Sequence, residues 1–466
     1  MNSPAATTHR GTLIGSIVLS AVLTAGLSAQ DWPNWRGPNY DGSADARQLP
    51  ADFGPDKHVR WSADLPGPAA GTPIIIGDRI FTSSTDPKRE RLMAVCLDRK
   101  DGSVRWKRDA GSGYRPGGSG SRLSGGRRSN YASPSPATDG ERVVFFFGNG
   151  DLVAYDLDGE ELWRRNIQED YGDFAFQWTF SASPTMWDGK LYLPVLQRDV
   201  AVQRRRRGGP APDDDAEPAP LESFLLALEP ATGETVFKVT RPSPARVESR
   251  ESYGTLIPYV SKDGRKELLL AGGDVITGHD PANGEELWRW GTWNPGHREQ
   301  WWRLVPTVVV GDGVGLVCAP KGQPVFAVRL DGEGELDQDA LAWKSGGRRN
   351  PISSDVPSPA FHDGHFFVLS DVRSALSKVN AGTGEVVWTT ALSKDYKWRA
   401  SPTVADGKVW CMNHNAEVTV LDAADGAILH SVRMGGEDDD GTRSSIIVAH
   451  GCLFIRTNAK MYCIGS

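Results

Sequence analysis

The sequence predicts an all-β fold, and three features of the 466-residue chain indicate it. Glycine (52 residues), proline (31) and tryptophan (16) are abundant, which suits short strands and tight turns better than long helices. One pattern of strands and turns recurs from about residue 72 onward. The last copy of this pattern lacks a strand, and a matching strand occurs near the start of the chain. Together these features predict repeated sheets arranged in a ring.

The first 29 residues predict a secretory signal peptide. Arg10 precedes an apolar stretch, residues 13–25, and small residues follow it up to Ala29, where a signal peptidase could cut. The stretch is short for crossing a membrane, which takes about 20 residues, so an uncleaved anchor is only the alternative. No cysteine near the cut could accept a lipid. We expect a mature chain without a transmembrane domain, exported to the periplasm or cell envelope.

Residues 30–57 form an N-terminal extension, and the repeat follows it. Each copy begins at Pro, usually Ser-Pro as at Ser358 and Ser401, and continues through Gly or Asp turns to a strand that closes on tryptophan. Seven copies are visible between residues 72 and 433, and two of them close on Phe237 and His430 instead. Each copy holds four short runs separated by turns, which is typical of a four-stranded antiparallel sheet.

An eighth sheet is predicted to join the two ends of the chain. Residues 444–466 supply three apolar runs but no closing strand, and residues 58–61 (His-Val-Arg-Trp) supply that strand. One such sheet cannot bury both of its faces alone, whereas radial stacking buries them against neighbouring sheets. We therefore predict that residues 58–466 form an eight-bladed β-propeller with about 51 residues per blade. Seven blades are the alternative.

The repeat resembles the pyrroloquinoline-quinone (PQQ) repeat of the quinoprotein alcohol dehydrogenase-like propellers, over residues 58–466. That superfamily includes PQQ dehydrogenases and BamB, a non-enzymatic lipoprotein of outer-membrane barrel assembly. Residues 32–38 (Trp-Pro-Asn-Trp-Arg-Gly-Pro) also resemble the start of exported propellers of this kind. The resemblance implies that the closing tryptophans pack flat between adjacent blades, which agrees with their size. These structural tryptophans are Trp61, Trp106, Trp163, Trp288, Trp343 and Trp388.

The long insertions are predicted to share one rim of the propeller. If every copy runs from the inner to the outer strand, the loops between blades and between the middle strands lie on that rim, which is the candidate functional face. The insertions are residues 111–133, 166–181, 197–222, 241–255, 291–303, 345–358 and 393–400. Insertion 197–222 combines a basic run, an acidic run and Pro-Ala repeats, so we expect a mobile, solvated loop. A docking tether is the alternative.

Three arginines precede inner strands on this rim. Aligning the repeats at their prolines places Arg303, Arg399 and Arg443 at one position in blades five, seven and eight, with Asp355 near it in blade six. Guanidinium groups with aromatic neighbours could hold a carboxylate, an anionic glycan or an acidic peptide. Alternatively, the arginines satisfy loop carbonyls and pair with acids such as Asp355, Glu251 or Glu299. The aromatic candidates are Trp178, Trp301, Trp302 and Trp398.

No catalytic set is recognisable in the sequence. For a PQQ dehydrogenase the resemblance implies calcium, an Asp base and a disulfide between adjacent cysteines, but the five cysteines are scattered and no haem motif is present. Cys452 and Cys463 flank a hairpin turn and could bridge it, or remain buried thiols. HExxH, GxSxG and Walker motifs are absent too. We expect no catalytic residue, metal or cofactor, with PQQ and calcium as the alternative.

The sequence thus favours an exported, non-catalytic propeller that binds a protein or anionic glycan through its insertion-rich rim. This hypothesis is BamB-like, with a role in cell-envelope or outer-membrane assembly. The alternative is a divergent PQQ-dependent alcohol or sugar dehydrogenase, and a third hypothesis is a hydrolase or lyase acting on polysaccharide. The net charge of −7 argues against nucleic acid as a partner. We expect a monomer.

Overall fold

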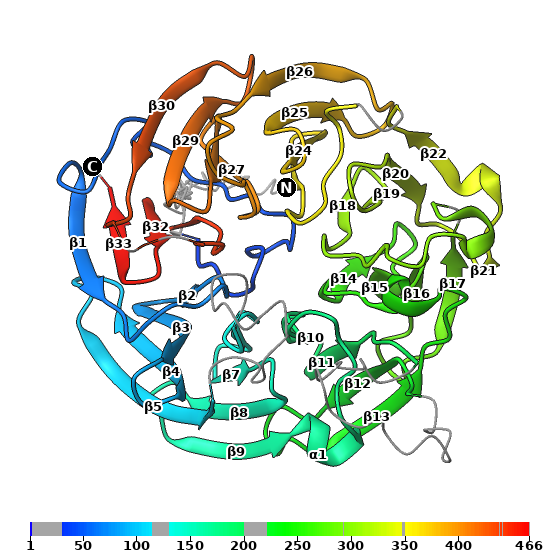
Figure 1. Ribbon diagram of the computed structural model, residues 1–466, viewed down its shortest axis with the longest axis horizontal. Coiled ribbons are helices and arrows are strands. Elements are labelled where there is room, and N and C mark those ends of the chain that lie inside the picture. Colours follow the sequence, from blue (N-terminus) through cyan, green and yellow to red (C-terminus); the bar gives the residue numbers. More distant parts are fainter. Residues whose placement is uncertain are drawn as a thin grey trace, which may run out of the picture.

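The computed structural model describes residues 1, 30–113, 130–199, 221–291, 293–346, 350–437, 439 and 441–465. Within these residues the strands form eight separate sheets around a central axis (Figure 1). The predicted eight-bladed propeller is therefore confirmed. The predicted signal peptide and the central parts of insertions 111–133 and 197–222 lie outside the described residues. Within the described residues, no helix has the length and apolar character needed to cross a membrane.

Each blade is built on four antiparallel strands in chain order; a short fifth strand adds to blade four, and blade eight takes its outer strand from the start of the chain. Blade one contains β2 (Ile74–Ile76), β3 (Arg79–Asp86), β4 (Arg91–Asp98) and β5 (Val104–Ser112). Blade two contains β6 (Ala137–Thr138), β7 (Arg142–Phe146), β8 (Asp151–Asp156) and β9 (Glu161–Asn166). Blade three contains β10 (Thr185–Trp187), β11 (Lys190–Val195), β12 (Phe224–Leu228) and β13 (Thr235–Thr240). Blade four contains β14 (Ile257–Val260), β15 (Lys266–Gly272), β16 (Val275–His279) and β17 (Glu286–Trp290).

The remaining blades follow the same order. Blade five contains β18 (Val309–Gly311), β19 (Val314–Cys318), β20 (Val325–Arg329) and β22 (Leu341–Lys344). Blade six contains β23 (Ala360–His362), β24 (His365–Ser370), β25 (Ala375–Asn380) and β26 (Val386–Ala391). Blade seven contains β27 (Thr403–Ala405), β28 (Lys408–Met412), β29 (Glu417–Asp422) and β30 (Ile428–Arg433). Blade eight contains β31 (Ile447–Ala449), β32 (Cys452–Arg456), β33 (Lys460–Ile464) and β1 (Val59–Asp64).

A few short elements add to these four-stranded blades or connect them. A short strand, β21 (Gly334–Glu335), pairs in parallel with β17, and one short helix, α1 (Ile167–Tyr171), follows β9. Three single turns of 3-10 helix occur in loops: η1 (Val247–Arg250), η2 (Pro295–His297) and η3 (Gln338–Ala340).

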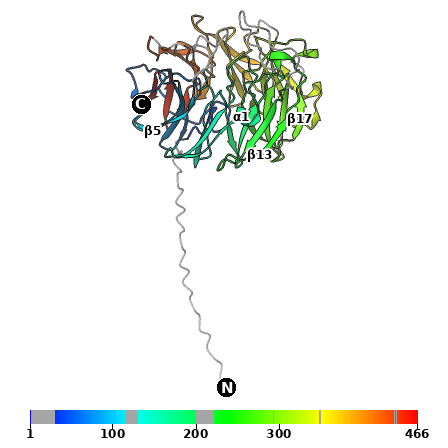
Figure 2. The same cartoon turned by 60° about the horizontal axis from the view of Figure 1, so that its bottom comes forward.

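Burial differs between middle and outer strands because neighbouring blades cover the middle strands on both faces. The four central residues of β8 are all buried, whereas no residue of the outer strand β9 is buried. Figure 2 shows two outer strands, β13 and β17, running along the side of the ring. All five cysteines are buried free thiols, including Cys452 and Cys463 on β32 and β33. The core therefore consists of the interfaces between blades.

The two ends of the chain close the ring as predicted. Strand β1 pairs antiparallel with β33, so that Trp61 lies opposite Cys463 (Figure 1). The Trp61 indole Nε1 donates a hydrogen bond of 2.9 Å to the carbonyl oxygen of Arg99 in blade one. A Cβ atom on Gly102 would lie only 2.5 Å from Trp61 Cε3, so this turn must be glycine to lie flat on the indole. Blade eight is thus wedged against blade one.

The same contact recurs between other blades and explains the Gly and Trp spacing of the repeat. Glycine turns lie on Trp106, Trp163, Trp343 and Trp388 of the preceding blade. Trp288 differs, because its Nε1 donates to Glu267 Oε2 of its own blade at 2.6 Å. In that blade Trp290 makes the contact to blade five instead, donating to the Asp337 carbonyl at 3.1 Å.

Eight side-chain hydroxyls form a closed hydrogen-bonded ring around the axis. One serine or threonine lies two residues before each inner strand, and its backbone N–H donates to the hydroxyl of the equivalent residue in the next blade, at 2.8 to 3.2 Å. We call these residues the hydroxyl ring. They are Thr72, Ser135, Ser183, Thr255, Thr307, Ser358, Ser401 and Ser445. The Ser-Pro of the sequence repeat marks four of its eight members, Ser135, Ser183, Ser358 and Ser401.

The N-terminal extension, residues 30–57, crosses the inside of the ring; we call it the strap (dark blue in Figure 1). Its backbone bonds to Ile75 of blade one, Phe361 of blade six and Val404 of blade seven. Arg36 is 1% exposed and donates to the carbonyls of Pro359 at 2.8 Å and Pro402 at 3.0 Å. The strap is therefore an integral part of the propeller, which its sequence alone did not indicate.

Candidate functional site

A cavity of about 260 Å³ lies on the propeller axis, and we call it the axial pocket. Its walls are the ends of the loops that enter the inner strands, and Trp35 of the strap also lines it. The lining residues are Trp35, Ala70, Thr72, Ser133, Trp178, Thr179, Ser181, Ser183, Tyr253, Thr255, Arg303, Val305, Thr307, Val356, Ser358, Arg399, Ser401, Arg443 and Ser445. Because these loops carry the insertions, the pocket belongs to the insertion-rich face.

One repeat position supplies a lining residue from every blade: the residue two before the hydroxyl ring. Arg399 and Arg443 hold this position in blades seven and eight, but Val305 holds it in blade five. Arg303 lies two residues earlier, so the alignment that equated it with the other two arginines was wrong. The prolines caused the error, since Pro306 precedes its hydroxyl-ring residue whereas Pro402 follows Ser401.

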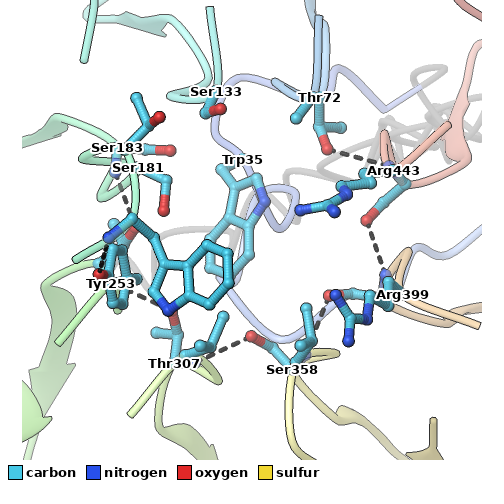
Figure 3. Close-up of a pocket in the computed structure, with 18 of the residues that line it drawn as sticks. Trp35, Thr72, Ser133, Ser181, Ser183, Tyr253, Thr307, Ser358, Arg399 and Arg443 are labelled. Atoms are coloured by element: carbon cyan, nitrogen blue, oxygen red, sulfur yellow. Dashed lines mark hydrogen bonds between the residues drawn. The ribbon is translucent and has the colours of Figure 1, made fainter. Parts of the chain in front are cut away.

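Arg399 and Arg443 together make one side of the pocket positive. Figure 3 shows Arg443 pointing towards Trp35, with Arg399 beside it. The nearest carboxylate to Arg399 is Asp371, whose Oδ2 lies 3.6 Å from Arg399 Nε, and that nitrogen has no hydrogen-bond partner among the described residues. Burial and the neighbouring Asp355 raise the pKa of Asp371, although Arg399 lowers it. The ion pair between Arg399 and Asp371 is thus longer than a hydrogen bond.

The pKa of His414 reflects burial and the positive charge of these two arginines. The pKa of His414 is lowered to about 3, mainly by burial and also by the positive charges of Arg443, Arg399 and Lys397. His414 is therefore neutral at physiological pH, and its Nε2 has no hydrogen-bond partner within the part of the chain that the structure describes. An anion that bound near Arg399 and Arg443 would reduce this repulsion.

Arg303 is neutralised instead. It donates two hydrogen bonds of 3.0 Å to the two carboxylate oxygens of Asp355, and both side chains are 12% exposed. Burial alone would raise the pKa of Asp355, but the bonds from Arg303 and from the Lys321 N–H bring it below its ordinary value. The pairing that the sequence left as an alternative therefore describes Arg303, which only lines the pocket edge.

This contrast gives a prediction. We expect Arg303→Gln to lower the free energy of unfolding by about 2–3 kcal/mol, because it breaks a bidentate, partly buried ion pair. Arg399→Gln should cost less, about 1 kcal/mol, because its side chain is 27% exposed and its ion pair with Asp371 is longer than a hydrogen bond. Urea denaturation of both variants measures the difference. Equal losses would show that Arg399 is as firmly engaged as Arg303.

The opposite wall of the pocket is held by a buried glutamate. Glu251 is fully buried, forms an ion pair with Arg198 and accepts a hydrogen bond of 2.5 Å from the Tyr253 hydroxyl. Burial raises the pKa of Glu251 to about 7, although Arg198 lowers it. Trp178 donates its backbone N–H to the Tyr253 oxygen at 3.1 Å and its indole Nε1 to Glu248 at 3.2 Å. These bonds fix the Trp178 indole in the wall.

The other aromatic candidates do not line the pocket. Trp301 is 52% exposed on the same face, where the Arg198 guanidinium lies 6.0 Å from its ring centre. Trp302 is half-buried and packs between blades four and five. Trp398 is fully buried and donates a hydrogen bond to the Ser393 carbonyl. It is therefore a core residue, and its prediction as an accessible site residue was wrong.

The lining does not fit a calcium-held quinone. Calcium requires several carboxylate, amide or carbonyl oxygens, and no Asp, Glu, Asn or Gln is among the lining residues described above. The acids behind the wall, Glu248, Glu251 and Asp355, already accept bonds from Trp178, Arg198 and Arg303. The described residues also contain no cluster of three His, Cys, Asp or Glu side chains that could hold a metal.

Eight four-stranded blades, with a glycine turn packed on a tryptophan at five of their contacts, place the protein in the class of PQQ-repeat propellers, which confirms the resemblance seen in the sequence. A family model described as "Outer membrane protein assembly factor BamB" matches residues 46–218 and 271–463. The chain belongs to this family.

Two curated relatives are similar over part of the chain. A polyvinylalcohol dehydrogenase from Pseudomonas sp. is 28% identical over 196 residues, which is 41% of this chain and 26% of that protein. The polyvinylalcohol dehydrogenase of Sphingopyxis sp. (strain 113P3) is 27% identical over 216 residues, 45% of this chain and 28% of that protein. The matched region thus spans little more than a quarter of either relative.

Solved structures of two kinds share the fold. The quinohemoprotein alcohol dehydrogenase from Comamonas testosteroni superposes with a TM-score of 0.64 at 13% identity, covering 94% of this chain and 81% of that one. BamB from Moraxella catarrhalis gives a TM-score of 0.56 at 14% identity, covering 87% and 96%. At these identities the likeness establishes the architecture and leaves the activity open.

Proposed function

We propose that the protein is an exported, non-catalytic propeller that binds an acidic partner by taking a carboxylate group into the axial pocket. One observation carries the proposal: the pocket lining combines Arg399 and Arg443 with many hydroxyl groups and no carboxylate. Guanidinium groups bind carboxylates by paired, charge-assisted hydrogen bonds. The described lining itself presents no carboxylate to a ligand, so a partner's carboxylate would meet guanidinium and hydroxyl groups there.

The same lining supports a binding role over a catalytic one. No His, Cys, Asp or Glu lines the described pocket, so no side chain there is suited to act as a general base at neutral pH. Within the described lining, no His, Asp or Glu accompanies the hydroxyl-ring residues to activate them as nucleophiles. The family description and the BamB structure support a role in the cell envelope, where the partner is a protein or a glycan.

A binding assay tests this proposal directly. Isothermal titration calorimetry of the purified protein with polyglutamate, polygalacturonate and neutral dextran compares acidic and uncharged partners. We expect heat of binding with at least one acidic polymer, weakening as salt rises, and none with dextran. Equal binding to dextran, or no binding to either acidic polymer, would contradict the proposal.

A PQQ-dependent dehydrogenase is the second candidate, and the similarity to polyvinylalcohol dehydrogenases supports it. The protein would be incubated with PQQ and calcium, freed of unbound quinone, and assayed for dye-linked oxidation of primary alcohols and poly(vinyl alcohol). We expect neither retained quinone absorbance nor oxidation, because the lining offers calcium no carboxylate. Quinone-dependent turnover would reverse the order of the two candidates.

A further inference from the structure

The shape of the axial pocket limits what can enter it. Its volume of about 260 Å³ lies just below the roughly 300–1,000 Å³ of pockets that hold drug-sized ligands. Trp35 closes part of it from the strap side, and the buried, doubly bonded Arg36 holds that segment in place. The pocket therefore suits a single end group and not a chain that threads through the ring.

The hydroxyl ring gives the pocket an unusual hydrogen-bonding capacity. Seven of its eight residues line the pocket, and each of these hydroxyls accepts one backbone N–H. A serine or threonine hydroxyl that accepts one bond still has its O–H to donate and a second lone pair. The ring can therefore both donate to and accept from a ligand on the axis, which matches a group carrying several hydroxyls of its own.

Charge and aromatic surface lie on opposite sides of this ring. Arg399 and Arg443 come from blades seven and eight, and Tyr253 lies across the pocket from them (Figure 3). Trp178, which is bonded to Tyr253, adds an indole to that wall, and Trp35 adds a second indole. A flat apolar surface facing hydroxyls and guanidinium groups favours a ligand with an apolar ring face and one carboxylate.

We propose that the end group taken by the axial pocket is a hexuronic acid, the acidic sugar at the end of a glycan. The carboxylate faces Arg399 and Arg443, the sugar hydroxyls meet the hydroxyl ring, and the C–H face of the pyranose packs on Trp178 or Trp35. This inference rests on the proposed function and narrows its partner. An acidic peptide fits less well, because it has neither the several adjacent hydroxyls that the hydroxyl ring can bond nor the flat C–H face of a pyranose.

Direct titration with small probes tests the inference. Calorimetry and saturation-transfer NMR on the purified protein would compare galacturonate, glucuronate, galactose, acetate and a short glutamate peptide. We expect a hexuronate to bind at least about tenfold more tightly than galactose, acetate or the peptide, since only the hexuronate uses charge, hydroxyls and ring face together. Acetate or the peptide binding as tightly as the better-binding hexuronate would overturn the inference.

Variants of Trp178 distinguish the contribution of the indole to binding from the contribution of the ligand's charge. Trp178→Ala should weaken hexuronate binding at least about fivefold and leave acetate binding unchanged, whereas the exposed Trp301→Ala should alter neither. Trp178→Phe keeps an aromatic ring and should retain part of the affinity for hexuronate. Melting temperatures of all variants show whether a loss of binding reflects a folding defect. Equal loss for acetate and hexuronate would count against the inference. Binding of the peptide alone would refute only the hexuronate, whereas binding of no carboxylate at all would refute the proposed function as well.

Discussion

Replacing both Arg399 and Arg443 by alanine is expected to weaken carboxylate binding at the axial pocket by at least about 100-fold. Each hydrogen bond to a charged group contributes about 1.5–3 kcal/mol, so the loss of two guanidinium groups removes about 3 kcal/mol or more. The lining offers no other cation except Arg303, whose charge is already taken by Asp355. Calorimetric titration of wild type and the double variant with the same acidic ligand measures the change.

A matched control separates the pocket from general electrostatics. Arg298 is exposed on the same insertion-rich face, and Arg298→Ala removes the same type of charge outside the pocket lining. We expect this control to bind the ligand within about twofold of wild type, because exposed charges at a distance are screened by salt. If the control loses as much affinity as the pocket variants, binding reflects net charge and the axial pocket is not the site.

Trp61→Ala is expected to lower the free energy of unfolding by about 3–5 kcal/mol, as large-to-small changes of buried aromatic residues do. Trp61 is 9% exposed, packs between the turn at Gly102 and Phe454, and donates a hydrogen bond to the Arg99 carbonyl. The residue lies where the N-terminal strand joins the C-terminal blade, so its loss weakens the closure of the whole ring. Urea denaturation followed by tryptophan fluorescence and circular dichroism measures the effect.

The comparison for this prediction is another tryptophan. Trp301 is 52% exposed, so Trp301→Ala should change stability by no more than about 0.5 kcal/mol. Similar losses in the two variants would mean that the closure between blades eight and one contributes no more than a surface side chain. That result would contradict the role we assign to the pairing of β1 with β33.

The blade architecture could be predicted from the sequence because its signals are local. A glycine turn, a strand and a closing tryptophan lie within one repeat, and each dictates its own conformation and its contact with the next blade. The missing strand of the last repeat was found at residues 58–61, and β1 is that strand. The strap role of residues 30–57 was not predictable, since its partners are carbonyls more than 300 residues away.

The composition of the site was decided by the tertiary structure. Arg303 and Arg399 are alike in the sequence, but Asp355, 52 residues from Arg303, neutralises only the first of them closely. Trp178 and Trp398 are both loop tryptophans, yet one lines the pocket and the other is buried in the core. The amino-acid order thus specified the ring and its closure, because hydrogen bonding and turn geometry act between neighbours. Only the tertiary structure determined how closely each arginine pairs with a carboxylate, because charge pairing depends on distance in space.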